Sequence, residues 1–369
     1  MSKEPNPCER RKARVASLAM PLALFHLNAS RCILGPFLIV LIALAAAISC
    51  RGPESHTTSQ TTVPASGFVF TAAGDYGSSR DTSATLDRIA RSGANFNLAL
   101  GDLSYTDASE SDWCDYVRSR VGDSFPFQLV AGNHEDDFGG DGHISEFAAC
   151  LPDRMDSVGD YPEEYYFDYR GLARFIVISP DLTIEGKHYF YGDSNKHYRW
   201  VAKTIDDARA SNIPWVIVSM HKNCLSVGAY YCNIYQELMS LLVEKKVDLV
   251  LQAHDHTYQR TKQLSTGSSC ATVKVDSFDE DCVVDSGEDN AYEKGAGPVF
   301  VTTGAAGADL YETNADDPEA GYFVKWMGAN SDPRKGFAKF TLSRAEISAK
   351  FVGSTSTSDF TDRFRIGER

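Results

Sequence analysis

The chain of 369 residues is 43% hydrophobic and 23% charged, which is the composition of a globular protein and excludes a chain that is disordered throughout. Its formal net charge is -14. Because an excess of negative charge repels polyanions, nucleic acid is not expected as a bulk partner.

Residues 1–50 have the features of an export signal. A basic stretch that begins at Arg10 precedes an apolar run over 33–48. The run ends in Ala-Ile-Ser before Cys50, which is similar to a bacterial lipoprotein cleavage site at which Cys50 would carry the lipid. Simple cleavage and an uncleaved membrane anchor remain alternatives, since about 16 apolar residues are marginal for spanning a bilayer. Each alternative predicts an extracytoplasmic protein, either secreted or attached to the cell envelope.

Residues 51–66 are rich in Ser, Thr, Pro and Gly, which predicts a flexible linker before a folded domain. The six cysteines that follow show no CxxC spacing of a zinc site, so disulfides in an oxidising compartment are favoured. Their clustering favours three pairs, which are Cys114 with Cys150, Cys224 with Cys232, and Cys270 with Cys282.

From Gly67 onward, short apolar runs rich in β-formers alternate with amphipathic stretches, a pattern typical of an α/β protein with helices on the faces of its sheet. Residues 265–297 are predicted to be a surface excursion. Their carboxylates could indicate calcium, but the ligand spacing is irregular and a solvated acidic loop is favoured. The folded domain is expected to span 67–353, with 354–369 as a frayed tail. The predicted strands are 68–73, 96–100, 127–131, 175–179, 215–220, 247–253, 298–303, 336–341 and 346–352, and the predicted helices are 82–91, 111–120, 198–210 and 234–245.

Five of these strands end directly in side chains that commonly bind metals. In open α/β sheets, ligands gather at the carboxyl ends of the strands, so these side chains are expected to meet. Any one of them alone is explained better as a helix cap or a turn residue. Recurrence after five strands, together with a His-x-His spacing that puts two imidazoles on one side of an extended segment, favours a metal site. The candidate ligands are Asp75, Asp102, Tyr105, Asn133, His221, His254 and His256.

These motifs, in this order, closely resemble the calcineurin-like metallophosphoesterase superfamily, and the Gly-Asp-x-x-Tyr motif that ends at Tyr105 is similar to that of purple acid phosphatases. The resemblance covers roughly residues 67–260. It implies a four-layer α/β/β/α sandwich of two mixed sheets flanked by helices. It also implies iron(III) at Asp75, Tyr105 and His256, a second ion (zinc, manganese or iron(II)) at Asn133, His221 and His254, and Asp102 bridging both.

The donor types agree with that implied pair of metals. Carboxylates and a phenolate suit a trivalent ion, whereas imidazoles and an amide oxygen suit a divalent ion. Two ions about 3.5 to 4 Å apart match the attacking and departing oxygens of an in-line phosphoryl displacement. A trivalent ion should acidify bound water more than zinc does, which predicts an acid optimum. The expected reaction is hydrolysis of a small phosphate monoester by a metal-bound hydroxide.

His134 resembles the family's pocket histidine and is expected to steady the phosphate or protonate the leaving oxygen; a structural hydrogen bond to Asp102 or Glu135 is the alternative. His143, His188 and His197 are interpreted as surface residues, although His143 could line the pocket.

Two positions depart from the family pattern. Ala253 replaces a glycine before the His-x-His pair, which removes no ligand. No histidine lies between His221 and His254, where larger purple acid phosphatases often have pocket histidines. Lys222, Asn223 or Tyr230 could take that role.

Three other functions fit parts of the pattern. A phosphodiesterase acting on nucleotides or phospholipid head groups would use the same metals. A cell-surface binding protein could retain the scaffold without turnover, although all seven ligand positions are filled. A di-iron protein that activates oxygen is disfavoured by the small number of carboxylates. The oligomeric state is not predicted by the sequence.

Overall fold

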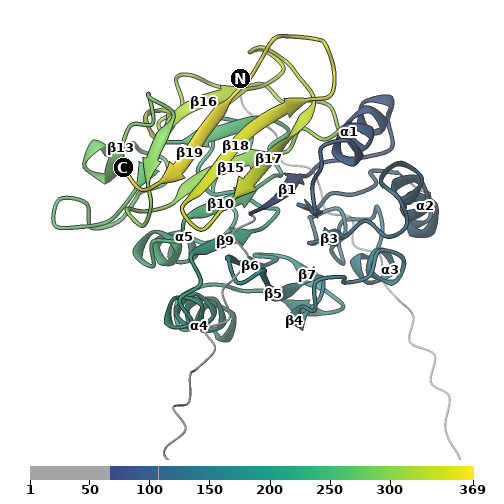
Figure 1. Cartoon of the computed structure of the whole chain (residues 1–369), viewed down its shortest axis with the longest axis horizontal. Helices are drawn as coiled ribbons and strands as arrows, with labels where there is room; N and C mark the ends of the chain where they lie inside the picture. The colour runs from purple at the N-terminus through teal and green to yellow at the C-terminus, as the bar shows by residue number, and fades with distance from the viewer. Residues whose placement is uncertain (1–66, 107) are drawn as a thin grey trace, which may run out of the picture. The chain divides into compact units, whose positions relative to one another are not determined.

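The computed structural model of the chain describes residues 67–106 and 108–369. These residues form two mixed sheets that pack face to face with helices outside them, which confirms the predicted four-layer sandwich (Figure 1). The predicted leader and linker, with the proposed Cys50 lipid and anchor, lie outside the described residues. No helix in the described part of the chain is long and apolar enough to cross a membrane.

The first sheet has three parallel strands at one edge and a parallel pair, β14 with β19, at the other. Neighbouring strands β1, β2 and β3 are parallel, whereas β17 joins β1 antiparallel. Alternate residues of β1, among them Phe70, face the second sheet and enter the core between the sheets. In order, the sheet consists of β14 (Ala291–Glu293), β19 (Arg363–Gly367), β18 (Glu346–Gly353), β17 (Gly336–Leu342), β1 (Phe68–Ala73), β2 (Phe96–Ala99) and β3 (Phe127–Leu129).

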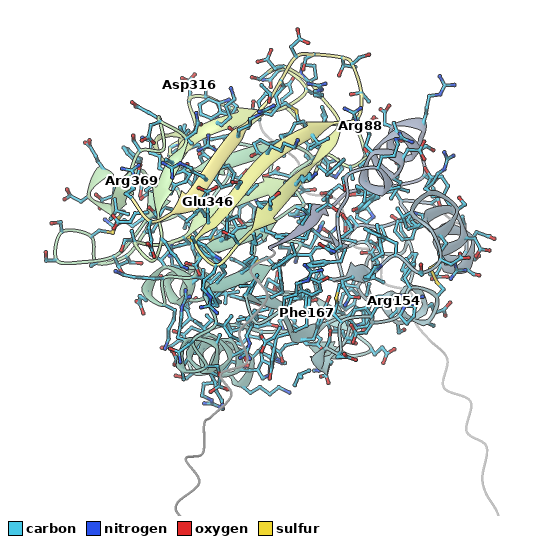
Figure 2. The ribbon with its side chains drawn as sticks, viewed as in Figure 1. Arg88, Arg154, Phe167, Asp316, Glu346 and Arg369 are labelled. Carbon is cyan, nitrogen blue, oxygen red and sulfur yellow. A yellow bond between two sulfur atoms is a disulfide. The ribbon has the colours of Figure 1, made fainter. Side chains whose placement is uncertain are left out.

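The second sheet has a parallel centre formed by β15, β10, β9 and β6. Phe175 of β6 meets Phe70 of β1 edge to face across the core, with ring centroids 5.0 Å apart, and stacks on Phe167 of β5. Phe167 is labelled in Figure 2. In order, the sheet consists of β16 (Phe323–Met327), β11 (Tyr258–Thr261), β15 (Val299–Thr303), β10 (Leu249–Gln252), β9 (Trp215–Ser219), β6 (Ala173–Val177), β5 (Glu164–Tyr169) and β4 (Val158–Asp160).

Four of the five α-helices in the described residues lie where the amphipathic stretches predict, whereas α3 was not predicted. The amino end of α1 is fixed by a capping box, in which Ser79 Oγ accepts from the Thr82 amide and Thr82 Oγ1 accepts from the Ser79 amide, both at 3.2 Å. α1 contacts the first sheet and α4 contacts the second. The helices are α1 (Arg80–Ala90), α2 (Glu110–Val121), α3 (Ile144–Cys150), α4 (Lys196–Ala210), α5 (Gln236–Glu244), and the 3-10 turns η1 (Glu280–Cys282) and η2 (Ala320–Tyr322). Two small two-stranded sheets, β7 (Thr183–Ile184) with β8 (Lys187–His188) and β12 (Gln263–Leu264) with β13 (Val283–Asp285), complete the fold.

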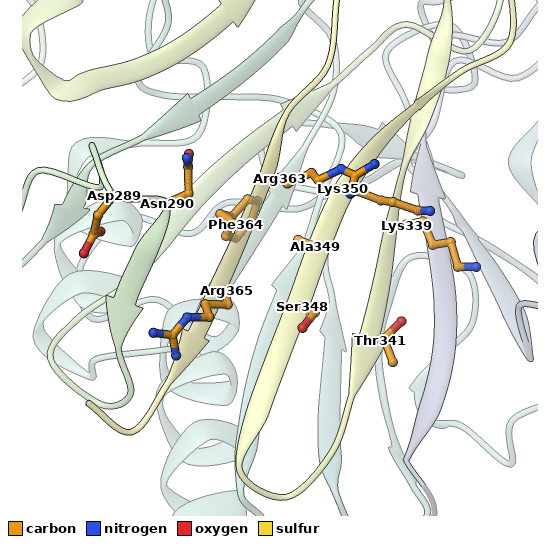
Figure 3. Close-up of a pocket in the computed structure, with 10 residues that line it drawn as sticks. All are labelled: Asp289, Asn290, Lys339, Thr341, Ser348, Ala349, Lys350, Arg363, Phe364 and Arg365. Carbon is orange, nitrogen blue, oxygen red and sulfur yellow. The ribbon is translucent and has the colours of Figure 1, made fainter.

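The outer face of β17, β18 and β19 carries no helix in Figure 1. On this face the register sets three cations directly opposite one another, because Lys339 pairs with Lys350 and Lys350 pairs with Arg363. Figure 3 shows these side chains together beside a shallow hollow. Hydroxyl groups from Thr341 and Ser348 form the next row.

The three predicted disulfides are confirmed: Cys114 is bonded to Cys150, Cys224 to Cys232, and Cys270 to Cys282.

The carboxyl-terminal segment differs from the expected frayed tail. Residues 363–367 form β19, which pairs antiparallel with β18 and parallel with β14. Phe364 and Ile366 are buried by this pairing. The segment over 265–297 also differs from the expected surface excursion, because it supplies β14 to the edge of the first sheet. β14 and β19 pair with each other although they are distant in sequence, so local composition did not reveal these strands.

His197 was wrongly predicted to be a surface residue. It lies in the first turn of α4 and is buried, and its Nδ1 atom is 2.8 Å from Glu164 Oε1. The carboxylate satisfies Nδ1 inside the core, whereas Nε2 has no hydrogen-bond partner among the described residues, so the cost of burying this polar ring is offset only in part. His188 and His143 are exposed as predicted.

Candidate metal centre

All seven predicted ligands follow the carboxyl ends of five parallel strands, and the structure brings them together. β1, β2 and β3 supply Asp75, Asp102, Tyr105 and Asn133 from the first sheet, whereas β9 and β10 supply the three histidines from the second. Backbone hydrogen bonds between these loops fix their relative positions, such as the bond from the Asp75 amide to the Gly101 carbonyl at 3.1 Å and from the Ala253 amide to the His221 carbonyl at 2.9 Å. The donors therefore converge where the two sheets meet.

The first group of donors surrounds the Tyr105 hydroxyl. Its oxygen lies 2.9 Å from Asp75 Oδ1, 2.9 Å from Asp102 Oδ2 and 2.9 Å from His256 Nε2. His256 Nε2 is itself 3.2 Å from Asp75 Oδ1. Four side chains thus point oxygen or nitrogen atoms into one small volume, as an ion requires.

The second group surrounds His221 Nε2. This nitrogen lies 3.1 Å from Asn133 Oδ1, 3.2 Å from His254 Nδ1 and 3.3 Å from Asp102 Oδ1. Asp102 therefore belongs to both groups and turns a different carboxylate oxygen toward each. That arrangement is the one that a bridging carboxylate adopts between two neighbouring ions.

The histidines are oriented so that a free nitrogen faces the centre. His221 Nδ1 donates to the Leu100 carbonyl at 2.7 Å, and His256 Nδ1 donates to the Asp309 carbonyl at 2.7 Å. In each ring the other nitrogen, Nε2, consequently faces the centre. His254 is reversed, with Nδ1 toward the centre and Nε2 3.5 Å from the Asn233 amide group. The supporting roles of Asp309 and Asn233 were not predicted, because neither stands at a fixed spacing from its histidine.

The backbone at the centre is strained. Asp75, Asp102, Tyr105 and His254 have φ angles of 62°, 51°, 53° and 69°, in the left-handed region that residues with a Cβ rarely adopt. Such conformations persist where the surrounding structure enforces them, and they concentrate at functional sites. Here Glu135 provides part of that enforcement, because its carboxylate accepts the amides of Asp102, Leu103 and Gly132 at 2.7 to 2.9 Å.

The charges at the centre fit a pair of cations. Asp75 and Asp102 are 0% and 2% exposed, and buried carboxylates at close range repel unless a positive charge lies between them. Burial, and then Asp75 and Asp102, raise the pKa of Tyr105 far above its usual range. Burial lowers the pKa of His254 to about 2, so this ring is a neutral donor. Burial also lowers the pKa of His221, but the Asp102 carboxylate outweighs it and raises this pKa to about 9.

His134 lies beside the first group. Its ring centroid is 4.4 Å from that of Tyr105, and its Nε2 is 3.7 Å from Asp102 Oδ2. Nδ1 bonds to the Asp141 carboxylate rather than to Glu135, and the backbone amide donates to Asp102 Oδ1 at 3.1 Å. Asp141 was missed by the sequence analysis, since an aspartate seven residues after a histidine in a glycine-rich loop has no distinctive spacing.

The candidates for a substitute pocket histidine differ in placement. Lys222 Nζ donates to Asp181 Oδ2 at 3.0 Å, and Asn223 donates to Asp255 at 3.0 Å, so both are engaged elsewhere. Tyr230 instead stacks on the His254 ring, with centroids 3.8 Å apart. Of the three, Tyr230 is the residue that reaches a predicted ligand.

Comparison with known proteins gives an independent assignment. Residues 56–258, more than half of the chain, match the family described as calcineurin-like phosphoesterase. Purple acid phosphatase 21 of Arabidopsis thaliana is 29% identical over 205 residues, which cover 53% of this chain and 45% of that protein. The Fe(3+)-Zn(2+) purple acid phosphatase 12 of the same plant is 28% identical over 220 residues, which cover 54% and 44%.

A purple acid phosphatase structure from yellow lupin seeds has the same fold, with a TM-score of 0.61 at 18% identity over 83% of this chain and 54% of that one. The chain spans about half the length of the curated relatives described above. It belongs to the calcineurin-like phosphoesterase family, as a member that resembles the purple acid phosphatases.

Proposed function

We propose that the protein is a binuclear metal-dependent acid phosphatase that hydrolyses small phosphate monoesters. The observation that carries the proposal is the position of Asp102, whose two carboxylate oxygens face two separate groups of donors. When bound, two ions at such a site supply Lewis acidity and a nucleophilic oxygen for in-line attack on phosphorus.

The two groups of donors support unlike ions. Asp75, Tyr105 and His256 would hold iron(III), because two of these donors are hard oxygen anions once the phenol is deprotonated. Asn133, His221 and His254 would hold zinc, manganese or iron(II), because an amide oxygen and two imidazoles suit a divalent ion. The printed name of one relative, an Fe(3+)-Zn(2+) purple acid phosphatase, agrees with this assignment.

His134 would act on the ester itself. Its Nε2 atom faces the centre while Asp141 holds Nδ1, so a proton on Nε2 could pass to the departing oxygen. The same Nε2–H could alternatively hold a phosphoryl oxygen. Asp141 acts through His134 and is a positioning residue.

An extracytoplasmic location is supported by the three disulfides, because such bonds persist in oxidising compartments. The proposed location is the cell envelope or the exterior of the cell.

The test uses the purified full-length protein before and after removal of its metals. We expect two ions per chain by elemental analysis, hydrolysis of p-nitrophenyl phosphate far above that of bis(p-nitrophenyl) phosphate, and loss of activity on chelation that the metals restore. A preference for the bis ester would identify a phosphodiesterase. Protein with both ions that hydrolyses neither ester would identify a binding protein, and either outcome would overturn the proposal.

A further inference from the structure

A cavity of about 580 Å³ opens beside the first group of donors. Three residues, Tyr105, His134 and His256, belong both to the metal centre and to the cavity wall. A phosphate ester whose phosphoryl group is held at the centre would therefore have its alcohol part directed into this cavity. His134, the proposed proton donor for the departing oxygen, lies at the boundary between the two.

Aromatic rings form one wall of the cavity. The His134 ring contacts the Tyr105 ring, and the Tyr105 ring meets the His256 ring at a centroid distance of 5.7 Å. Tyr311 extends the wall by stacking on His256, with centroids 4.0 Å apart and an interplanar angle of 10°. A flat aromatic group can pack against such a wall over a large area.

Tyr311 is held rigidly in this position. Its backbone amide donates to the His256 carbonyl at 3.0 Å, and the amide of Ala329 donates to the Tyr311 carbonyl at 2.7 Å. A ring that is fixed before the substrate arrives loses little conformational freedom on binding, which favours affinity.

The described part of the cavity wall carries no permanent positive charge. Among the described residues that line it there is no lysine or arginine, and the acidic one is Asp309. Lys335 lies behind the wall and donates to the Gly307 and Ala308 carbonyls, so it is already engaged with the backbone. Hydroxyl groups, such as those of Ser78 and Thr106, are the other polar groups facing the space.

We infer that this cavity is the leaving-group subsite and that it selects esters of uncharged aromatic alcohols, with Tyr311 as the specificity-determining residue. Leaving groups that carry further phosphates are disfavoured, because they would meet Asp309 and no cation. This inference rests on the proposed phosphatase function and names the substrate class.

Tyr230 provides a matched control. Like Tyr311 it stacks on a histidine of the centre, but the histidine is His254 and Tyr230 does not line the cavity. The Tyr230 ring also meets the Tyr311 ring edge to face, with centroids 6.0 Å apart, so in a Tyr230 variant it is the backbone bonds of Tyr311 that keep Tyr311 in place. If stacking only orients the histidines, replacing either tyrosine should change the preference for aromatic groups in the same way. If the cavity binds the alcohol, only replacement of Tyr311 should change the preference for aromatic groups.

The experiment measures binding, so that it does not depend on turnover. Benzylphosphonate and ethylphosphonate share a CH2–PO3 group, which carries a phenyl ring in the first and a methyl group in the second. Their dissociation constants for the metal-loaded full-length protein are compared by isothermal titration calorimetry. We expect the benzyl compound to bind about tenfold more tightly to the wild-type protein. Tyr311→Leu should remove most of this ratio, Tyr311→Phe should keep it, and Tyr230→Leu should leave it unchanged.

Equal affinity of the wild-type protein for both phosphonates would overturn the inference without any variant. So would an equal loss of the ratio in both leucine variants. As a second measurement, wild-type kcat/KM should be higher for phenyl phosphate than for inositol hexakisphosphate, and the reverse order would contradict the inference. The proposed function fails separately, when the metal-loaded protein hydrolyses no phosphate ester or prefers the bis ester.

Discussion

The Asp141 carboxylate bonds to Nδ1 of His134, which leaves the opposite nitrogen of the ring, Nε2, facing the metal centre. Because a carboxylate accepts hydrogen bonds, it keeps the Nδ1 proton in place and fixes the orientation of the ring. Ser104 secures the loop in turn, since its hydroxyl donates to the Asp141 carbonyl at 2.8 Å.

Asp141→Asn should weaken proton donation by His134. We expect kcat/KM for an alkyl phosphate, which has a poor leaving group, to fall roughly tenfold, and His134→Ala to lower it by roughly 10². The loss should be smaller for p-nitrophenyl phosphate, which needs little help in departing, and metal content should not change. Asp136→Asn in the same loop is the control, because its side-chain oxygen can still cap the Phe138 amide. Equal losses on both substrates would argue against proton donation.

Tyr105→Phe should abolish the visible absorption band of the iron-loaded protein. The Tyr105 hydroxyl lies within hydrogen-bonding distance of both carboxylates and His256, so its phenolate is placed to bind the trivalent ion and to give a ligand-to-metal transition. Tyr311→Phe, which removes a hydroxyl beside the same histidine, should keep the band. The measurement is a visible spectrum together with iron content. Persistence of the band in iron-loaded Tyr105→Phe would exclude Tyr105 as its source.

The sequence predicted the centre well because each ligand follows directly from a strand. Asp75 and Asp102 stand one residue after a glycine at the end of an apolar run, so the topology of parallel strands alone brings them together. Asp141 and Tyr311 could not be found this way. They stand on loops, and what places them is a contact with His134 or His256 that exists only in the folded chain. The same reason accounts for β19, because its parallel partner β14 is distant in sequence.

Glu319 should make the protein less stable as the pH rises. Burial, only partly offset by hydrogen bonds from the amides of Ser226 and Asp276, raises the pKa of Glu319 to about 7. The folded state therefore binds this proton more tightly than the unfolded state. The resulting stabilisation is complete below about pH 4.5 and is lost as the pH rises through about 7, a change on the order of 1–3 kcal/mol.

The check is urea unfolding of wild-type protein and Glu319→Gln at pH 5 and pH 7.5, both in the same metal state. Because glutamine cannot ionise, the free energy of unfolding should decrease less between the two pH values in the variant than in the wild type. Glu280→Gln, at an exposed position, should retain the full wild-type decrease. A variant at position 319 with the wild-type pH dependence would show that Glu319 titrates normally.

Lys350→Glu should stabilise the protein. Lys350 stands directly between Lys339 and Arg363 on the uncovered face of the first sheet (Figure 3), and like charges in opposite positions of neighbouring strands destabilise a sheet by roughly 0.2–1 kcal/mol. Burial and the nearby Lys350 lower the pKa of Lys339, in agreement with this repulsion. Urea unfolding at low salt should show a larger gain for Lys350→Glu than for Lys350→Gln, and high salt should reduce both gains. If the wild-type protein is more stable than both variants at low salt, the repulsion is ruled out.

Asp362 should be the residue that secures the carboxyl-terminal strand. Its carboxylate accepts Arg260 Nε at 2.7 Å and Nη2 at 2.9 Å, and the Tyr258 hydroxyl at 2.8 Å, all in buried surroundings. Asp362→Leu would leave the guanidinium of Arg260 buried without its counter-charge, and such a loss destabilises proteins by about 3–5 kcal/mol. Urea unfolding measures this difference, with Asp359→Ala as an exposed control that should change stability by less than about 0.5 kcal/mol.

The double variant Arg260→Met/Asp362→Leu separates the ion pair from the packing. Because the double variant removes both charges, it should recover much of the stability that Asp362→Leu loses. A double variant as unstable as Asp362→Leu would show that packing around Asp362, and not the buried charge of Arg260, holds β19 in place.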